Sequence, residues 1–330
     1  MRPGTRTGHA QLLGVGGYRP DKTVTNAEAA ARCGVTEAWI SSRTGILERR
    51  IAGPQETLAA MAISAARAAL DRTGVDPADV GCVLVASMSH TRQVPPLAPD
   101  VAYRLGATTA VAYDVSVACS GFCYALAQAA DHVRSGSTRY ALVIGAERMS
   151  DITDPADPGT GPLFADGAGA VLIGPADTPG IGPVTWGADG GRDQTITMTS
   201  TWAQAQANRA GPPPAVTMDG GRVWSWIRSQ VVDAIGRTLS QSGVSFDDVA
   251  VFVPHQANGR IIDMLVERLH LPDHVLVARD ITHSGNTSAA SIPLALDRLY
   301  TERRARTGDL ALLFGFGAGL AYAGQLVTLP

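Results

Sequence analysis

The sequence predicts an α/β protein built from two similar halves, and two observations indicate this. The chain repeats itself: GVDPADVGCVLVAS (74–87) resembles GVSFDDVAVFVPHQ (243–256), and ALVIGAERMS (141–150) resembles ALLFGFGAGL (311–320). The offsets are 169 (243 minus 74) and 170 (311 minus 141), so both pairs occur in the same order at nearly one spacing. Short apolar runs, typical of strands covered on both faces, alternate with segments of helical periodicity.

Each half is predicted to run helix, strand, helix, strand. In residues 56–74, apolar side chains recur at helical spacing from Leu58 to Ala69, and Gly74 is typical of a helix C-terminus. The predicted strands are CVLVAS (82–87), AYDVSVA (112–118), YALVIGA (140–146), GAVLIG (169–174), VAVFVPH (249–255), HVLVA (274–278) and LALLFGFG (310–317). The Gly- and Pro-rich segment 174–183 is the predicted junction, and residues 189–214, which lack periodicity, are predicted to form an irregular surface loop.

The composition of the chain argues against some classes of function. The chain has 330 residues, which suggests about two domains at roughly 150 residues each, and it is 45% hydrophobic and 17% charged, as in folded proteins. A net charge of −3 argues against whole-protein attraction to nucleic acid or an anionic membrane. No apolar run is long enough to span a bilayer, and residues 1–20 lack the apolar segment of a signal peptide. We therefore expect a cytoplasmic protein with no nucleic-acid or membrane partner.

The cysteine pattern favours a nucleophile over a metal site. Cys33, Cys82, Cys119 and Cys123 form no pair of CxxC motifs and no Cys/His zinc spacing. We predict no structural metal and no disulfide framework in a cytoplasmic chain of this size.

Cys119 lies where a strand-like segment, AYDVSVA, gives way to a helical one, CSGFCYALAQAADHV. A helix N-terminus favours the thiolate, so we expect a lowered thiol pKa. The alternative is a buried, inert cysteine, which is the more common fate of a lone cysteine. The small neighbours Ala118, Ser120 and Gly121 should leave access to the sulfur and favour a function, whereas Cys123, one turn later, is predicted to pack in the core.

Two further polar residues lie at strand or loop ends. His255 follows a predicted buried strand in VFVPHQANGRIID, where α/β folds place their sites, although a core or capping histidine is an equal alternative. Asn286 lies in THSGNTSAASIPLALDRL, in a tight loop that enters a helix, where a plain N-cap is the default interpretation. His283 is interpreted as a surface residue.

Several motifs in one register resemble ketosynthase III, the β-ketoacyl-ACP synthase III family. DVSVACSGFCYAL, VPHQAN and GNTSAASIP are similar to the three active-site motifs of that family, and SRTGILERRIA, FADGAGAVLIG and LLFGFGAGLAYAGQ extend the similarity nearly end to end. The resemblance implies the thiolase fold: two duplicated βαβαβαββ halves in a five-layer α-β-α-β-α arrangement. Residues 1–175 would form the half carrying the nucleophile, and residues 176–330 the half carrying the histidine and asparagine.

The resemblance also implies roles for these residues. Cys119 would accept an acyl group from acyl-CoA, and malonyl-ACP would then lose CO2 and attack the acyl-cysteine. His255 and Asn286 would stabilise the enolate, while the backbone N–H groups of Cys119 and Ala318 would form a second oxyanion hole. The family usually has glycine at the Ala318 position, but a backbone donor survives that change. A Cys-His-Asn set differs from the Cys-His-His set of elongating ketosynthases.

Residues near the predicted CoA and carrier site only partly follow the family pattern. Trp39 matches a tryptophan that stacks on the CoA adenine, Arg43 a phosphate contact, and Asn258 and Arg260 a carrier-docking position. The arginine expected opposite the tryptophan is Pro158, and a commonly present lysine is Ser225. Some contacts would then be missing, or rebuilt by Arg222 or Arg228.

The acyl pocket implied by the resemblance includes Phe316 and, across the axis of a homodimer, Val94. Acetyl-preferring members have phenylalanine at the Val94 position, so we expect a deeper pocket and a starter of about three to six carbons, at roughly 0.8 kcal/mol per buried CH2.

The similarity of PVTWGAD and TSTWAQ to starter-loading enzymes leads us to predict a polyketide-priming ketosynthase III. Its expected partners are acyl-CoA, malonyl-ACP and a second copy of the chain, and no cofactor is expected. One alternative is an acyltransferase that passes the acyl group from Cys119 to another acceptor without condensation. The alternative from another class is an inactive partner or binding subunit.

Overall fold

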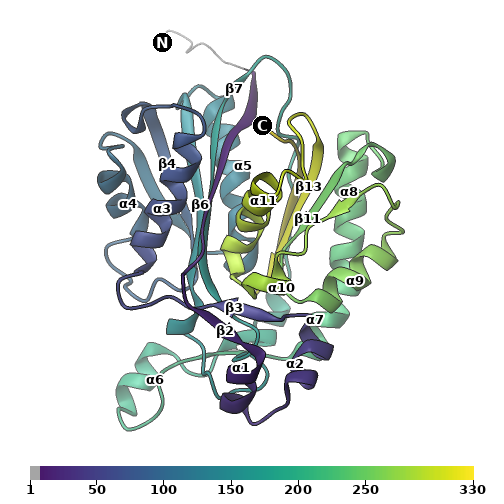
Figure 1. Cartoon of the computed structure of the whole chain (residues 1–330). Helices are drawn as coiled ribbons and strands as arrows, with labels where there is room; N and C mark the ends of the chain where they lie inside the picture. Colours follow the sequence, from purple (N-terminus) through teal and green to yellow (C-terminus); the bar gives the residue numbers. More distant parts are fainter. Residues whose placement is uncertain (1–7) are drawn as a thin grey trace.

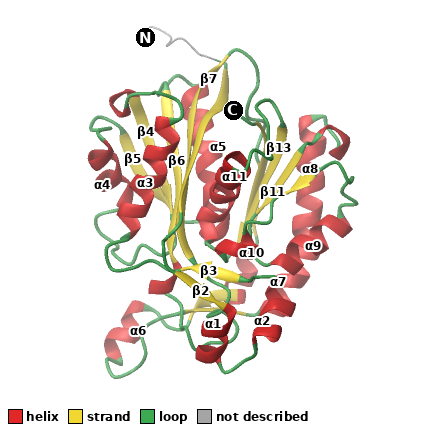
Figure 2. Ribbon diagram, in the orientation of Figure 1, coloured by secondary structure: helices red, strands yellow, loops and turns green. Residues whose placement is uncertain are grey.

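The computed structural model, which describes residues 8–330, consists of five layers (Figures 1 and 2). Two five-stranded sheets enclose a central pair of helices, and further helices cover the outer face of each sheet. The central helices are α5 (Gly121–Arg134) and α11 (Ser291–Thr301). This arrangement confirms the predicted α/β fold with its α-β-α-β-α layers.

The first sheet has the strand order β1-β7-β6-β4-β5. Its strands are β1 (His9–Tyr18), β4 (Val80–Ala86), β5 (Val111–Val115), β6 (Tyr140–Arg148) and β7 (Asp166–Ala176). Strand β4 pairs in parallel with β5 and β6, whereas β7 pairs antiparallel with β6 and β1. Their near-continuous Val, Ile, Leu and Ala content follows from burial on both faces, because helices cover the sheet on each side.

The second sheet repeats this topology in the order β8-β14-β13-β11-β12. Its strands are β8 (Thr185–Ala188), β11 (Val251–Pro254), β12 (Leu276–Val277), β13 (Leu310–Gly317) and β14 (Ala321–Thr328). Strand β11 is parallel to β12 and β13, and β14 is antiparallel to β13 and β8. Strands β4 and β11, and likewise β6 and β13, contain the two segment pairs whose similarity predicted the duplication.

Three apolar clusters separate the layers. The central cluster joins both sheets through α5 and α11, with Phe122, Leu126 and Leu296 fully buried. A second cluster lies under α3 (Leu58–Asp71) and α4 (Leu97–Leu105), and a third under α8 (Val232–Ser242) and α9 (Gly259–Arg268). Helix α11 belongs to the second half of the chain yet packs on β1 and β7, so the boundary at residues 175/176 stays a prediction.

Shorter elements gather at one end of the two sheets (Figure 1). They are β2 (Thr23–Thr25), α1 (Asn26–Cys33), α2 (Glu37–Thr44), β3 (Glu48–Arg50), α7 (Gly220–Trp226) and α10 (Ile281–Ser284). None of the helices in residues 8–330 is long and apolar enough to cross a bilayer.

The prediction of an irregular surface loop over residues 189–214 was wrong in part. The segment contains β9 (Ile196–Met198) and α6 (Trp202–Ala207), and β9 pairs antiparallel with β10 (Val216–Met218). These strands are three residues long, too short to give a recognisable period. They matter because Ile196, Val216 and Met218 line the cavity described next.

Candidate active site

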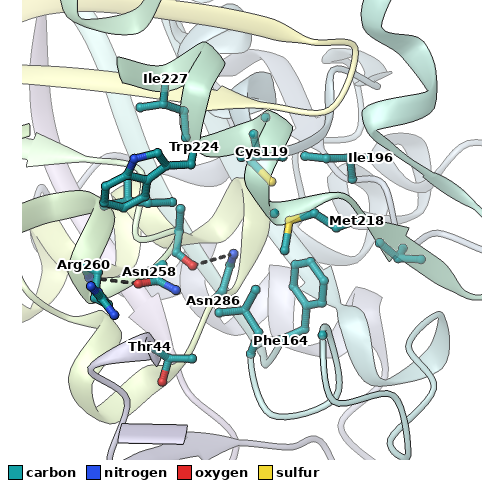
Figure 3. Close-up of a pocket in the computed structure, with 18 of the residues that line it drawn as sticks. Thr44, Cys119, Phe164, Ile196, Met218, Trp224, Ile227, Asn258, Arg260 and Asn286 are labelled. Carbon is teal, nitrogen blue, oxygen red and sulfur yellow. Dashed lines mark hydrogen bonds between the residues drawn. The ribbon is translucent and has the colours of Figure 1, made fainter. Parts of the chain in front are cut away.

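A cavity of about 490 Å³ lies between the two halves and brings the predicted residues together. Cys119, His255 and Asn286 all line it, although they come from three separate parts of the chain. In the close-up of Figure 3, the Cys119 sulfur and the Asn286 amide point into the same space. The wall around them is largely apolar and includes Phe164, Trp224, Ile227, Phe316 and Met218.

Cys119 occupies a tight turn between strand and helix, as predicted. Strand β5 ends at Val115, a 3-10 turn covers Ala118–Ser120, and α5 begins at Gly121. Ala118 has a φ of 45°, a left-handed conformation that is uncommon for a residue with a side chain. This turn presents Cys119, which is 8% exposed, to the cavity. Gly317 faces it closely: a Cβ there would lie 2.7 Å from the Cys119 Cβ and 3.0 Å from its sulfur.

The expectation of a lowered Cys119 pKa was wrong in this structure. Burial raises the pKa of the thiol to about 12, because desolvation penalises the charged thiolate. Among its small neighbours, Ser120 is fully buried, and a Cβ on Gly121 would lie only 3.2 Å from the Ala86 Cβ, so close packing also requires small residues here. The raised pKa therefore favours the neutral thiol of Cys119 in this structure. Cys123 packs in the central core, as predicted.

His255 is held in one orientation directly after β11. Its Nδ1 lies 2.7 Å from the Ser291 hydroxyl, and its ring packs edge-to-face on Phe316 with 5.3 Å between centroids. The Ser291 oxygen also accepts the Gln256 N–H at 3.3 Å. We therefore assign the Ser291 hydrogen to Nδ1 and the ring proton to Nε2. Burial lowers the His255 pKa to about 3, so the ring is neutral and can donate one hydrogen bond from Nε2.

Asn286 combines a local capping role with a group directed at the cavity. Its side-chain oxygen accepts the Ser288 N–H at 2.9 Å, a local turn bond, although the N-cap of the 3-10 turn is Thr287 and the N-cap interpretation of Asn286 was wrong by one residue. Its amide Nδ2 donates to the Ala257 carbonyl at 3.1 Å, the bond drawn in Figure 3. That bond uses one of two amide hydrogens and leaves the other free to donate to a ligand. His283 lies apart, half exposed and 3.5 Å from Glu48, as expected for a surface residue.

The remaining predicted pocket residues divide into two groups. Ala318 and Phe316 line the cavity with Cys119, so the predicted oxyanion hole of Cys119 and Ala318 N–H groups stays compatible with the geometry. Val94 does not line this chain's own cavity and is 78% exposed, on the loop before α4. Its role across a dimer axis stays a prediction.

The predicted CoA and carrier residues cluster at one part of the cavity wall. Trp39, Arg43, Asn258 and Arg260 line it together with Pro158. The Arg43 guanidinium lies over the Trp39 ring, 4.9 Å from its centroid, so one face of the indole is covered by a cation.

Hydrogen bonds between α2 and α9 fix this part of the wall. Asn258 caps α9 and donates to the Arg43 carbonyl at 3.0 Å, and Arg260 reaches the Ser42 carbonyl at 3.3 Å. Arg222 and Arg228, considered as replacements for missing contacts, are exposed and do not line the cavity.

Several cavity residues were missed from the sequence. Trp224 and Ile227 are on the continuous helical segment that begins with α7, Met88 follows β4, and Phe164 lies just before β7. The only signal for Trp224 was an aromatic pair in RVWSWIR, which core packing explains equally well. Ser291, which orients His255, looks like an ordinary helix-start serine.

Comparison with protein families matches two regions of the chain. Residues 113–190 match the family described as 3-oxoacyl-[acyl-carrier-protein (ACP)] synthase III, and residues 239–329 match its C-terminal part. The first region contains Cys119 and the second contains His255 and Asn286.

Whole-chain relatives agree with this match. A Streptomyces lividans protein named β-ketoacyl-[acyl-carrier-protein] synthase III is 49% identical, covering 97% of this chain and 95% of that protein. A mycobacterial β-ketoacyl-[acyl-carrier-protein] synthase III from Mycobacterium bovis is 45% identical over 97% of this chain and 95% of its own length. The crystal structure of the priming β-ketosynthase from the R1128 polyketide biosynthetic pathway superimposes with a TM-score of 0.97 at 48% identity, covering 100% of this chain and 98% of that one.

Proposed function

The chain belongs to the 3-oxoacyl-[acyl-carrier-protein] synthase III family of condensing acyltransferases, and from this premise we propose that it primes a polyketide pathway by joining an acyl starter to malonyl-ACP. The observation that carries the proposal is the convergence of Cys119, His255 and Asn286 on one largely apolar cavity. The name of the R1128 priming enzyme supports the polyketide assignment.

The first half-reaction would load the starter. The Cys119 sulfur attacks the thioester of acyl-CoA, the new thioester forms, and the CoA thiolate leaves. The N–H groups of Cys119 and Ala318 are the proposed donors to the oxygen of the tetrahedral intermediate. Trp39, Arg43, Asn258 and Arg260 would hold the CoA or the carrier arm at the wall that they share.

The second half-reaction would use the side-chain donors His255 and Asn286. Malonyl-ACP loses CO2, and negative charge develops on its thioester oxygen. Neutral His255, through Nε2, and Asn286, through Nδ2, would donate to that oxygen. The carbanion then attacks the acyl-cysteine and releases β-ketoacyl-ACP. A neutral donor suits this step, because a thioester enolate needs hydrogen bonds and no proton transfer.

The proposed assembly is a homodimer. Strand β5 is an edge strand of the first sheet, and Val111 on it is 62% exposed. Nearby in sequence, Tyr103 on α4 is 73% exposed, and such apolar edges favour pairing with another chain. A second copy would also bring a Val94 to each acyl pocket.

Mass spectrometry of the intact protein tests the function. We expect incubation with a panel of acyl-CoAs to add one acyl mass, and subsequent malonyl-ACP to remove it as β-ketoacyl-ACP. Loading without consumption of malonyl-ACP would favour the acyltransferase alternative. No loading by any acyl-CoA would favour the inactive-subunit alternative and overturn the proposal.

A further inference from the structure

Arg19, which directly follows β1, joins the first half of the chain to two helices of the second half. Its Nε donates to the Ser284 hydroxyl at 3.2 Å, and its Nη1 donates to Asp297 at 3.0 Å. Its Nη2 donates both to Asp280 at 3.2 Å and to the Leu294 carbonyl at 2.7 Å. Four of the five N–H groups of the guanidinium are thus used, and all four bonds go to α10 with its N-cap or to α11.

Charge balance does not require this arginine. Asp280 also pairs with Arg298 at 2.5 Å, and Asp297 also pairs with Arg72 at 2.9 Å. The two carboxylate side chains are only 3% and 9% exposed, so each needs a cation beside it, and each has one without Arg19. What Arg19 adds is a connection between α10 and α11, because its single planar group bonds both helices.

The two helices that Arg19 joins place the proposed enolate donors. Helix α10 ends two residues before Asn286. Helix α11 begins at Ser291, whose hydroxyl lies 2.7 Å from Nδ1 of His255. The spacing of the two donors therefore depends on how α10 lies relative to α11, which the bonds of Arg19 fix.

The residue after His255 strengthens the link to α10. Gln256 is fully buried, and its side-chain oxygen accepts the N–H of Ile281, the first residue of α10, at 3.1 Å. A displacement of α10 would therefore be passed to His255 through its neighbour as well as to Asn286 along the chain.

We propose that Arg19 is a positioning residue that holds α10 against α11 and so fixes the spacing of His255 Nε2 and Asn286 Nδ2 for malonyl decarboxylation. The proposal rests on the proposed function, in which these two side chains donate to the enolate oxygen. Arg19 does not line the cavity, so it acts through these donors and not on the substrate. An oxyanion site works because its donors are in place before the charge develops, so loosening them slows the step that uses them.

The loading step should be insensitive to Arg19. The N–H groups proposed to assist acylation belong to Cys119, in the turn before α5, and Ala318, directly after β13. None of the hydrogen bonds that Arg19 makes within residues 8–330 reaches either segment. A general loss of stability would affect both half-reactions, whereas a positioning role changes the ratio of decarboxylation to loading.

Arg19→Met tests this role, because methionine keeps an apolar stem and removes the guanidinium. Release of labelled CO2 from malonyl-ACP should fall about 10-fold, while acyl loading, measured by intact-protein mass spectrometry, should stay within about twofold. A displacement of about 1 Å can cost 100-fold, but Arg298 and Arg72 still pair with the two carboxylates and limit the movement. Arg19→Lys should resemble Arg19→Met, because an ammonium group cannot reproduce the planar fork.

Arg72→Met is the matched control. Arg72 pairs with the same Asp297 carboxylate, but it also donates to the Val15 carbonyl of β1, and none of its bonds within the described residues goes to α10. The ratio of decarboxylation to loading should not change in this variant, because Arg19 still joins the two helices. In an Asn286→Ala background, Arg19→Met should slow decarboxylation by less than about threefold, since one of the donors that it positions is already gone.

Thermal unfolding shows whether Arg19→Met is folded. If it is not, Ser284→Ala decides the question, because it removes one partner of the guanidinium and leaves the ion pairs in place. The loss of one hydrogen bond should lower the ratio of decarboxylation to loading by about threefold.

Several results would overturn the positioning role. They are an unchanged ratio in a folded Arg19→Met, or in Ser284→Ala where that variant decides, and full recovery of the ratio in Arg19→Lys. A shift in Arg72→Met as large as that in Arg19→Met, or an undiminished effect in the Asn286→Ala background, would also contradict it. If the wild type neither loads an acyl group nor releases CO2 from malonyl-ACP, the proposed function fails, and the role of Arg19 falls with it. An active wild type with an unchanged ratio in the variants overturns the role of Arg19 alone.

Discussion

In both halves of the chain, the same local structure precedes the central helix. In the first half, Ala118 has a φ of 45° and a 3-10 turn leads into α5; in the second, Ser288 has a φ of 46° and a 3-10 turn leads into α11. The two positions are 170 residues apart (288 minus 118), the offset of the sequence repeat. By this correspondence Ala289 is the counterpart of Cys119.

What faces each turn differs between the halves. Gly317 of β13 lies against Cys119, whereas Glu147 of β6, at the same offset of 170 (317 minus 147), accepts the Ala289 N–H at 3.3 Å. The Ala289 N–H of the second turn corresponds to the Cys119 N–H of the first. It donates to the carboxylate of Glu147, a residue of the protein itself. In the first turn the corresponding residue is a glycine, Gly317, and Cys119 lines a cavity, where the proposed mechanism places a substrate oxygen near the Cys119 N–H.

The largest expected effect tests whether acylation occurs only at the turn that carries Cys119. Cys119→Ala should abolish acylation by acyl-CoA, because its counterpart Ala289 has no nucleophile. Cys123→Ala, one helical turn along α5, should leave acylation largely intact. Intact-protein mass spectrometry measures both. Stoichiometric acylation of Cys119→Ala would show that another residue is the nucleophile.

The next effect separates the contributions of the halves to the two steps. His255→Ala and Asn286→Ala should reduce malonyl-ACP decarboxylation by about 100- to 1000-fold, as expected when an oxyanion donor is lost. Acylation of Cys119 should fall far less, since its proposed donors are backbone N–H groups. Release of labelled CO2 and the rate of acyl loading provide the two readings. Equal losses in both steps would contradict a division of labour between the donors.

A smaller effect tests the glycine that keeps the first turn open. A Cβ at Gly317 would lie 2.7 Å from the Cys119 Cβ, so Gly317→Ala should displace the thiol at a cost of about 1–3 kcal/mol. If that cost falls on the transition state, acylation slows by about 5- to 150-fold. Gly236→Ala is the control, because this exposed glycine on α8 has open space around it and alanine favours a helix. Thermal unfolding and acylation rates should show that Gly236→Ala is stable and active. A fully active Gly317→Ala would mean that the turn at Cys119 accommodates a methyl group at position 317.

The sequence predicts the scaffold better than the local chemistry. Buried strands such as β4 and β6 are recognisable because burial on both faces demands continuous apolar residues. Cys119, His255 and Asn286 stood out because each lies where a strand or loop meets a helix, but only the resemblance of their motifs to ketosynthase III assigned their roles. Strands β9 and β10 were missed, since three residues show no period and their pairing is decided by tertiary contacts.

Electrostatics were the least predictable part. The turn at Cys119 suggested a lowered pKa, but the depth of burial, which no local pattern reports, raises it to about 12. Glu147 gave no signal because it directly follows an apolar strand run, where a carboxylate is usually at the surface. One of its hydrogen-bond donors, the Ala289 N–H, lies 142 residues away in sequence (289 minus 147).

The smallest effect concerns a loop that only the first half has. Residues 87–96 connect β4 to α4, whereas the equivalent connection from β11 to α9 needs only residues 255–258. The longer loop carries Val94 away from its own cavity, 78% exposed, as a residue that closes a partner's acyl pocket would be. Val94→Phe should then shift loading toward acetyl-CoA and away from butyryl-CoA, because overfilling a packed pocket typically costs about 1–3 kcal/mol. The measurement is the ratio of the two acylation rates, with sedimentation to show that the oligomeric state is unchanged. An unaltered ratio in an intact dimer would place Val94 outside the pocket and leave the extra loop as an interface element only.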